Sequence, residues 1–112
     1  MAFTALYVAD DDIVDYTPTA DVAAGDVVVQ GDLVGVAKKP IPANTAGALA
    51  VEGLFDVPKA TGAGSGIAAG TSVYWDATNK VATATAGTNK LMGKTALAAA
   101  DADVTVRVRL HQ

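Results

Sequence analysis

The fold of this chain is decided by the stretch DVTVRVRL, residues 103–110, which is followed by His111. Its apolar positions are Val104, Val106, Val108 and Leu110, and the polar positions that alternate with them are Thr105, Arg107, Arg109 and His111. Successive side chains of a β-strand point to opposite faces, so this spacing puts every apolar group on one face. It predicts a strand that rests one face on a hydrophobic core.

The same period of two continues outward along the chain and marks two hairpins. DVVVQGDLVGVA, residues 26–37, reads as two strands joined at Gly31-Asp32, because a type II′ turn prefers glycine first. A two-residue loop there sets Val29 opposite Val34 on the same side as residues 27 and 36. SVYWD (72–76) and KVATAT (80–85) predict a second hairpin around residues 77–79.

Other segments complete an all-β pattern. ALAVEGLFDVPK (48–59) is expected to be a strand with a bulge or sharp bend at Gly53 and an end at Pro58, and KLMGKTAL (90–97) a shorter strand. TGAGSGIAAG (61–70) and KKPIPAN (38–44) are expected to be loops, whereas ALAAADAD (96–103) has the propensity for a helix of two turns at most. Residues 23–37 and 68–82 both read AAG, strand, turn, strand, which suggests a duplicated hairpin unit.

We therefore predict an all-β fold: a small single-domain β-barrel or β-tulip-like domain, or a sandwich of short antiparallel strands, with at most one short helix. Residues 1–22 are expected to form an N-terminal arm or the first strands, with contact to a partner, and residues 23–112 the β domain.

Composition narrows the function. The chain has 112 residues, no cysteine, one histidine and a net charge of −4, with 8 Lys and Arg against 12 Asp and Glu. The lack of cysteine excludes disulfides and cysteine nucleophiles. A single histidine leaves almost no residue for His-based proton transfer, and the excess of acidic residues argues against binding to nucleic acid. No run approaches the roughly 20 apolar residues of a membrane span, and no basic, apolar leader precedes the Asp run. An enzyme is not expected.

Four patterns imitate functional motifs. GTNKLMGKT (87–95) differs from a phosphate-binding loop because its first glycine is out of register, and GSGIAA (64–69) leaves no room for the helix of a dinucleotide site. Asp10, Asp11, Asp12 and Asp15 lack calcium-loop spacing, and a triad of Ser65 or Ser72 with His111 would depend on a residue at a frayed end. We expect no cofactor, no metal and no small-molecule substrate.

Aromatic residues are the candidates for an interface. Tyr74 and Trp75 are neighbours in a predicted strand, so one points inward and the other at least partly outward. Phe3 and Tyr7 share a parity in a segment that is either a core strand or an arm ordered by a partner. Outward aromatic side chains are common in protein interfaces, which makes these four residues candidate contacts.

Taken together, these segments resemble the small capsid decoration, or cement, proteins of tailed bacteriophages. The resemblance rests on the order GDVVVQGDLVGVA (25–37), IPANTAGALAVEGLFDVPK (41–59), GTSVYWD (70–76) with KVATAT, GKTALAAA (93–100) and DVTVRVRL. It spans roughly residues 23–110, and DDDIVDYTPTADV (10–22) departs from the family's shorter start. Members are sometimes labelled recombinase-like, a label that the misplaced glycines at 87–95 do not support.

The resemblance implies a structural virion protein without catalytic activity. Such a protein is made in the bacterial host cytoplasm, binds the major capsid protein on the outer surface of the phage head, and stabilises the expanded capsid lattice, commonly as a homotrimer. The alternative is another phage β-module, such as a tail, fibre-attachment or host-interaction adaptor.

Overall fold

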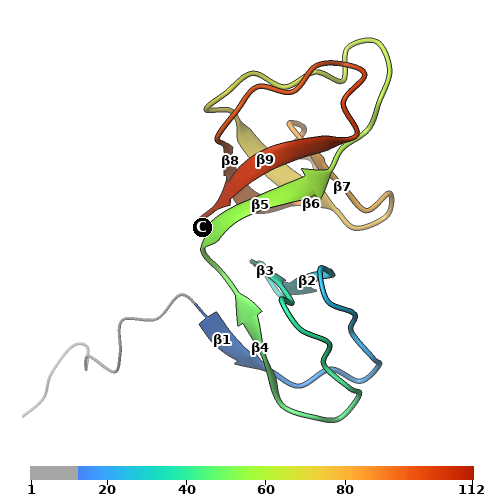
Figure 1. Cartoon of the computed structure of the whole chain (residues 1–112), viewed down its shortest axis with the longest axis vertical. Coiled ribbons are helices and arrows are strands. Elements are labelled where there is room, and N and C mark those ends of the chain that lie inside the picture. The colour runs from blue at the N-terminus through green and yellow to red at the C-terminus, as the bar shows by residue number, and fades with distance from the viewer. Residues whose placement is uncertain (1–12) are drawn as a thin grey trace, which may run out of the picture.

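The computed structural model describes residues 13–112, which form two antiparallel β-sheets and no helix (Figure 1). The first sheet has the strand order β1-β4-β3-β2, with β1 Ile13–Tyr16, β2 Val27–Gln30, β3 Leu33–Val36 and β4 Gly47–Ala50. The second has the order β5-β9-β8-β6-β7, with β5 Gly53–Pro58, β6 Ser72–Asp76, β7 Val81–Thr83, β8 Lys90–Thr95 and β9 Thr105–Leu110. The all-β prediction is confirmed, and the arrangement is sandwich-like.

The strand predicted from DVTVRVRL is β9, and its apolar face is confirmed with one exception. Val106, Val108 and Leu110 are buried, whereas Val104 is 68% exposed and lies before the strand begins. β9 pairs with β5 on one side and β8 on the other, so it is a central strand of the second sheet. Pairing starts only at Thr105, and Val104 therefore stays outside the core.

Both predicted hairpins are present. Gly31 has φ 62° and Asp32 has no positive φ, as a type II′ turn requires, and β2 faces β3 in the expected register. β6 and β7 form the second hairpin through residues 77–80, with Lys80 at φ 55°. Local turn chemistry was sufficient to identify these elements.

The prediction of one strand over residues 48–59 is wrong, and of the two alternatives at Gly53 the sharp bend is present and the bulge is not. The chain leaves the first sheet after Ala50 and enters the second at Gly53, so β4 and β5 belong to different sheets (Figure 1). Gly53 has φ 129°, a conformation that L side chains rarely adopt, and this turns the chain between the two layers. The expected end at Pro58 is confirmed.

The alanine-rich segment 96–103 forms no helix. Ala99 instead makes an isolated antiparallel bridge with Ile67, with N···O distances of 2.9 and 2.8 Å. The Asp103 carboxylate accepts the N–H of Ala100, and the Asp103 N–H bonds back to the Ala100 carbonyl, which closes a tight turn. These backbone bonds replace the helical ones, so tertiary contacts override the intrinsic propensity of alanine.

The suggested duplication of residues 23–37 in residues 68–82 is wrong in its second strand, because residues 81–83 form β7, whereas β3 corresponds to β8. A repeat is nevertheless present, and it extends over both sheets. β1-β4-β3-β2 in the first sheet corresponds to β5-β9-β8-β6 in the second, and β7 is an additional strand at the edge. Equivalent glycines precede the hairpins: Gly25 donates to the Ala37 carbonyl at 2.6 Å, and Gly70 donates to the Thr95 carbonyl at 2.8 Å. Isolated bridges recur at matching places, 22 with 41 and 67 with 99. The chain thus builds one four-stranded motif twice.

A main hydrophobic core joins the two sheets. Val34 and Val36 of β3 pack with buried residues of the second sheet, including Met92 and Val108. Gln112 adds a polar link: its side-chain amide accepts the Val34 N–H at 2.7 Å and donates to the Val34 carbonyl at 2.9 Å. β4 pairs with β3 only at Val36. At Val34 the Gln112 side chain therefore makes the two hydrogen bonds that a neighbouring strand would otherwise make.

Candidate interaction surfaces

Two of the four candidate interface aromatics lie within the described residues. Tyr74 and Trp75 do face opposite sides of β6: Trp75 is 7% exposed and belongs to the core, whereas Tyr74 is half-buried on the other face. Phe3 and Tyr7 lie outside the described residues. Interface roles for all four remain predictions, with Tyr74 on the more accessible face.

The structure also exposes apolar residues that the sequence analysis did not select. Leu54 is 62% exposed on β5, directly opposite Arg109 of β9, and Leu97 is 56% exposed in the segment between β8 and β9. The sequence could have predicted the exposure of Leu54. In a strand it lies on the face opposite to Phe55 and Val57, and those two side chains face the core. Exposed apolar side chains of this size on a small domain are potential contact points.

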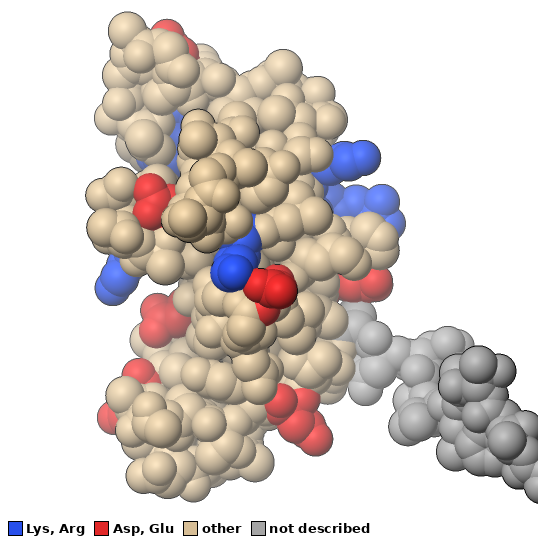
Figure 2. Space-filling model, turned by 180° about the vertical axis from the view of Figure 1, so that it is seen from behind, with Lys and Arg blue, Asp and Glu red and all other residues tan. Residues whose placement is uncertain are grey.

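Charge is divided between the two sheets. In residues 13–52, the acidic side chains of Asp15, Asp21, Asp26, Asp32 and Glu52 outnumber Lys38 and Lys39. In residues 53–112 the basic side chains predominate. Figure 2 shows red groups without blue ones over the lower part of the molecule, and blue groups together with some red ones over the middle and upper part. The first sheet is therefore acidic and the second carries a small excess of cations, a difference that favours some orientations of its contacts over others.

Basic residues concentrate on the solvent-facing side of the second sheet. Lys94 of β8 lies directly across from Arg109 of β9, and both are exposed. Arg107 is paired with Asp56, with N···O distances of 3.0 and 3.2 Å. The Arg107 hydrogen bond lowers the pKa of the Asp56 carboxyl, and the same bond raises the pKa of Arg107.

Two other carboxylates are stabilised in their charged form. Lys90 bonds Asp32 at 2.6 Å and thereby lowers the pKa of that carboxyl, joining β8 to the turn between β2 and β3. The Asp76 carboxylate accepts the backbone N–H groups of Thr78 and Asn79 and the Asn79 side-chain amide. These bonds, led by those of Asn79, lower the pKa of Asp76 and fasten the loop after β6.

Both glycine-rich motifs have structural roles. Residues 90–95 are strand β8, and a side chain at Gly93 would meet the backbone of Arg109 in β9. In the 61–70 loop, the N–H groups of Gly64 and Gly66 are taken by the Asp101 carboxylate at 3.3 and 2.6 Å. A phosphate would therefore compete with the protein's own acid, and neither segment is followed by the helix such sites use.

The side chains of the suggested Ser-His triad bond to other groups. Ser65 donates to the carbonyl oxygens of Gly62 and Asp101, and His111 Nδ1 lies 3.3 Å from Glu52. Asp10, Asp11 and Asp12 lie outside the described residues. Within residues 13–112, no group of His, Asp and Glu side chains is arranged to hold a metal ion, and no helix has the length and apolarity to cross a membrane.

Comparison with known proteins identifies the family of this all-β chain. A family model described as phage cement protein matches residues 8–110. The chain belongs to this phage cement protein family. No curated protein and no solved structure matches it. The match begins ahead of the motifs at residue 23 and so includes β1.

Membership settles the class of function. The protein decorates and stabilises the phage capsid, is located on the capsid surface of the virion, and is not an enzyme.

Proposed function

We propose that the chain binds the major capsid protein on the outer face of the expanded head as a homotrimer. The match to the phage cement family over residues 8–110 carries this proposal. We further propose that residues 1–22, as an arm or as first strands, contact a partner and lead into the β domain of residues 23–112; β1 pairs with β4 over its whole length.

The size of the domain supports a multivalent mode of binding. A chain of 11.2 kDa offers a small area to any one neighbour, and small interfaces are weak. Three linked copies bind better than one, because each later contact is intramolecular. The division between acidic and basic sheets favours head-to-tail contacts, which close into rings.

Within this proposal, the solvent-facing side of β6, β8 and β9 supplies contacts. Tyr74 lies there, with Leu91 across from it on β8 and the cations Lys94 and Arg109 nearby in the sheet. Leu91 is 41% exposed. Trp75 contributes only through the edge it leaves accessible, while Phe3 and Tyr7 are assigned to the arm.

The experiment that tests the proposal measures binding of purified protein to isolated phage heads before and after expansion. We expect saturation on expanded heads at a fixed ratio to the major capsid protein and a mass near three times 11.2 kDa for the free protein in sedimentation equilibrium. Equal binding to both head forms would overturn the dependence on expansion, and a monomer at all concentrations would overturn the homotrimer.

A further inference from the structure

Comparison of the two repeated motifs shows that one strand edge lacks its cover. In the second sheet, β7 pairs along the outer side of β6 through Tyr74, Trp75 and Asp76. The corresponding strand of the first sheet is β2, which is the last strand of its sheet within residues 13–112. Open edges are normally short, charged or covered, and β2, with four residues, is short. Its sequence Val-Val-Val-Gln, however, carries no charge.

The backbone of β2 is set up to accept another strand. Gln30 and Leu33 close the two-residue turn as a hydrogen-bonded pair, and such pairs alternate along antiparallel strands. Val27 and Val29 therefore turn their N–H and C=O groups away from β3. Val34, which lies opposite Val29 in β3, confirms this alternation. Its N–H and C=O groups point away from β2, and both are bonded to the Gln112 side chain.

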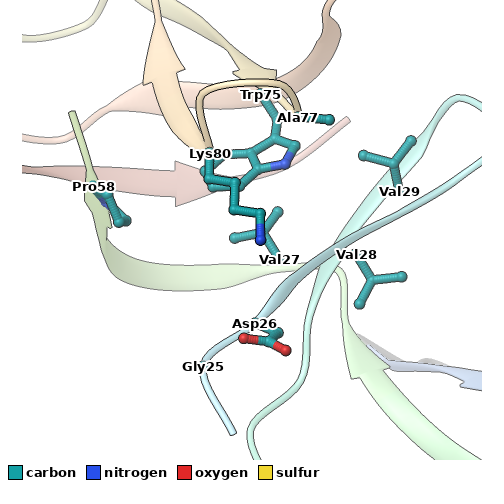
Figure 3. Close-up of a pocket in the computed structure, with 9 residues that line it drawn as sticks. All are labelled: Gly25, Asp26, Val27, Val28, Val29, Pro58, Trp75, Ala77 and Lys80. Atoms are coloured by element: carbon teal, nitrogen blue, oxygen red, sulfur yellow. The ribbon is translucent and has the colours of Figure 1, made fainter. Parts of the chain in front are cut away.

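A groove of about 390 Å³ runs beside this edge. Its walls are β2 on one side and Pro58, Trp75, Ala77 and Lys80 of the second sheet on the other (Figure 3). In Figure 3 the Lys80 side chain extends over the groove toward Val27. The lining is mainly apolar, and the residual exposed edge of Trp75 faces it. In a strand added to β2, every second side chain would point into this groove and contact its lining.

We propose that residues 1–12 of a second copy occupy this groove and pair with β2. This inference rests on the proposed homotrimer and specifies its contact. Residues 3–8, Phe-Thr-Ala-Leu-Tyr-Val, are a β-forming stretch, and at about 3.3 Å per residue they match the length of β2 and its flanks. β7 shows which occupant suits such an edge, since it is a short extended Val-Ala-Thr segment.

A second copy is the better donor than the same chain. Residues 1–12 lead into β1, and β1 and β2 lie on opposite edges of the first sheet. A segment from the same copy would have to cross the sheet before it reached β2, whereas a neighbouring copy can approach directly. Donor segment and acceptor edge are different surfaces, so the contact is heterologous and three copies can close a ring.

Disulfide trapping tests the proposal, because the native chain has no cysteine. Full-length Ala5→Cys and ¹⁵N-labelled Ala77→Cys are mixed and oxidised, and mass spectrometry identifies the linked pairs. We expect pairs of the two variants to exceed, by at least tenfold, those formed when Ala46→Cys, in the exposed loop before β4, replaces Ala77→Cys. A yield equal to this control overturns the proposal. So does an intrachain bond in the Ala5→Cys/Ala77→Cys double variant at low concentration.

Filling the groove provides the second test. Ala77 lies in the loop after β6 and lines the groove, so Ala77→Arg places a long side chain in it. Thr78→Arg is the matched control, because it adds the same side chain at the next residue, which does not line the groove. We expect Ala77→Arg to weaken self-association at least tenfold and Thr78→Arg to leave it unchanged. Equal behaviour of the two variants contradicts the proposal.

The outcomes separate this inference from the proposed function. If Ala77→Arg loses binding to expanded heads but no copies are cross-linked, a capsid segment occupies the groove; the inference then fails and head binding stands. If copies are cross-linked but the protein does not bind heads, the edge pairing stands and head binding fails.

Discussion

The bridge between Gln112 and Val34 gives the sharpest test of how the two sheets are held together. Val34 is fully buried, and both of its outward backbone groups are bonded to the Gln112 amide. Gln112→Ala removes both bonds. A typical intramolecular hydrogen bond contributes about 0.5–1.5 kcal/mol, so we expect a loss of about 2 kcal/mol in the free energy of unfolding. For a domain of this size that lowers Tm by roughly 8–12 °C.

The assay combines urea denaturation with amide hydrogen exchange. Gln112→Ala is expected to lower the denaturation midpoint with an unchanged m value, and to speed exchange at the Val34 amide. Gln112→Glu keeps the size of the side chain but lacks the donor for the Val34 carbonyl, so it should be nearly as unstable. His111→Ala is the matched control, because it removes only an exposed pair with Glu52 and should change stability by less than about 0.5 kcal/mol.

The reasoning is refuted if Gln112→Ala and His111→Ala have the same stability and the Val34 amide exchanges at the parent rate in both. In that case water satisfies Val34 as well as the side chain does, and the hydrophobic core alone joins the sheets.

Three further predictions concern the strands and turns. Val106→Asp buries an unpaired charge and should abolish soluble folded protein or lower the free energy of unfolding by more than about 4 kcal/mol. Val104→Asp, at an exposed position, should change it by less than about 0.5 kcal/mol. Equal solubility and equal urea midpoints of the two variants would contradict the assignment of the β9 face. Gly31→Val strains the φ 62° position of the first hairpin and should cost about 1–2 kcal/mol by urea denaturation, and an unchanged midpoint would argue against the type II′ turn. The pKa of Asp76 is lowered in the folded state, so its stabilisation is complete above the unfolded pKa of about 3.9 and is lost as the pH falls through the folded value. Thermal melts between pH 6 and pH 2 should therefore show a smaller acid-induced drop for Asp76→Ala than for the parent, and parallel curves would contradict this.

The duplication explains why the surface properties differ between two similar halves. The second motif packs in the main core with β2 and β3 of the first, whereas β1 and β4 contribute to a separate cluster around Leu49. Only the second motif carries the extra strand β7. The first motif thus keeps an open edge at β2, and the second presents a cationic outer face. A capsid-bound protein needs both cohesion between copies and adhesion to the shell, and the two halves offer different surfaces for these tasks.

The candidate interface was only partly accessible to sequence reasoning. The period of two correctly separated Tyr74 from Trp75, because the alternation of side chains is a local property of a strand. It did not reveal which of the two is buried, since this depends on which sheet face meets the core. The groove beside β2 was beyond reach for the same reason: Val27 and Pro58 come from different sheets.

By itself, the sequence determined the features that act over a few residues. The strand β9, the Gly31 turn and the β6–β7 hairpin follow from alternation and from the φ that glycine permits. Tertiary structure decided the rest. The chain changes sheets at Gly53, Ala99 pairs with Ile67 where the sequence favoured a helix, and the Gln112 side chain bonds the Val34 backbone. The physical reason is that these outcomes depend on hydrogen-bond partners that are distant in the chain. The propensities of single residues do not specify which distant partners come together on folding.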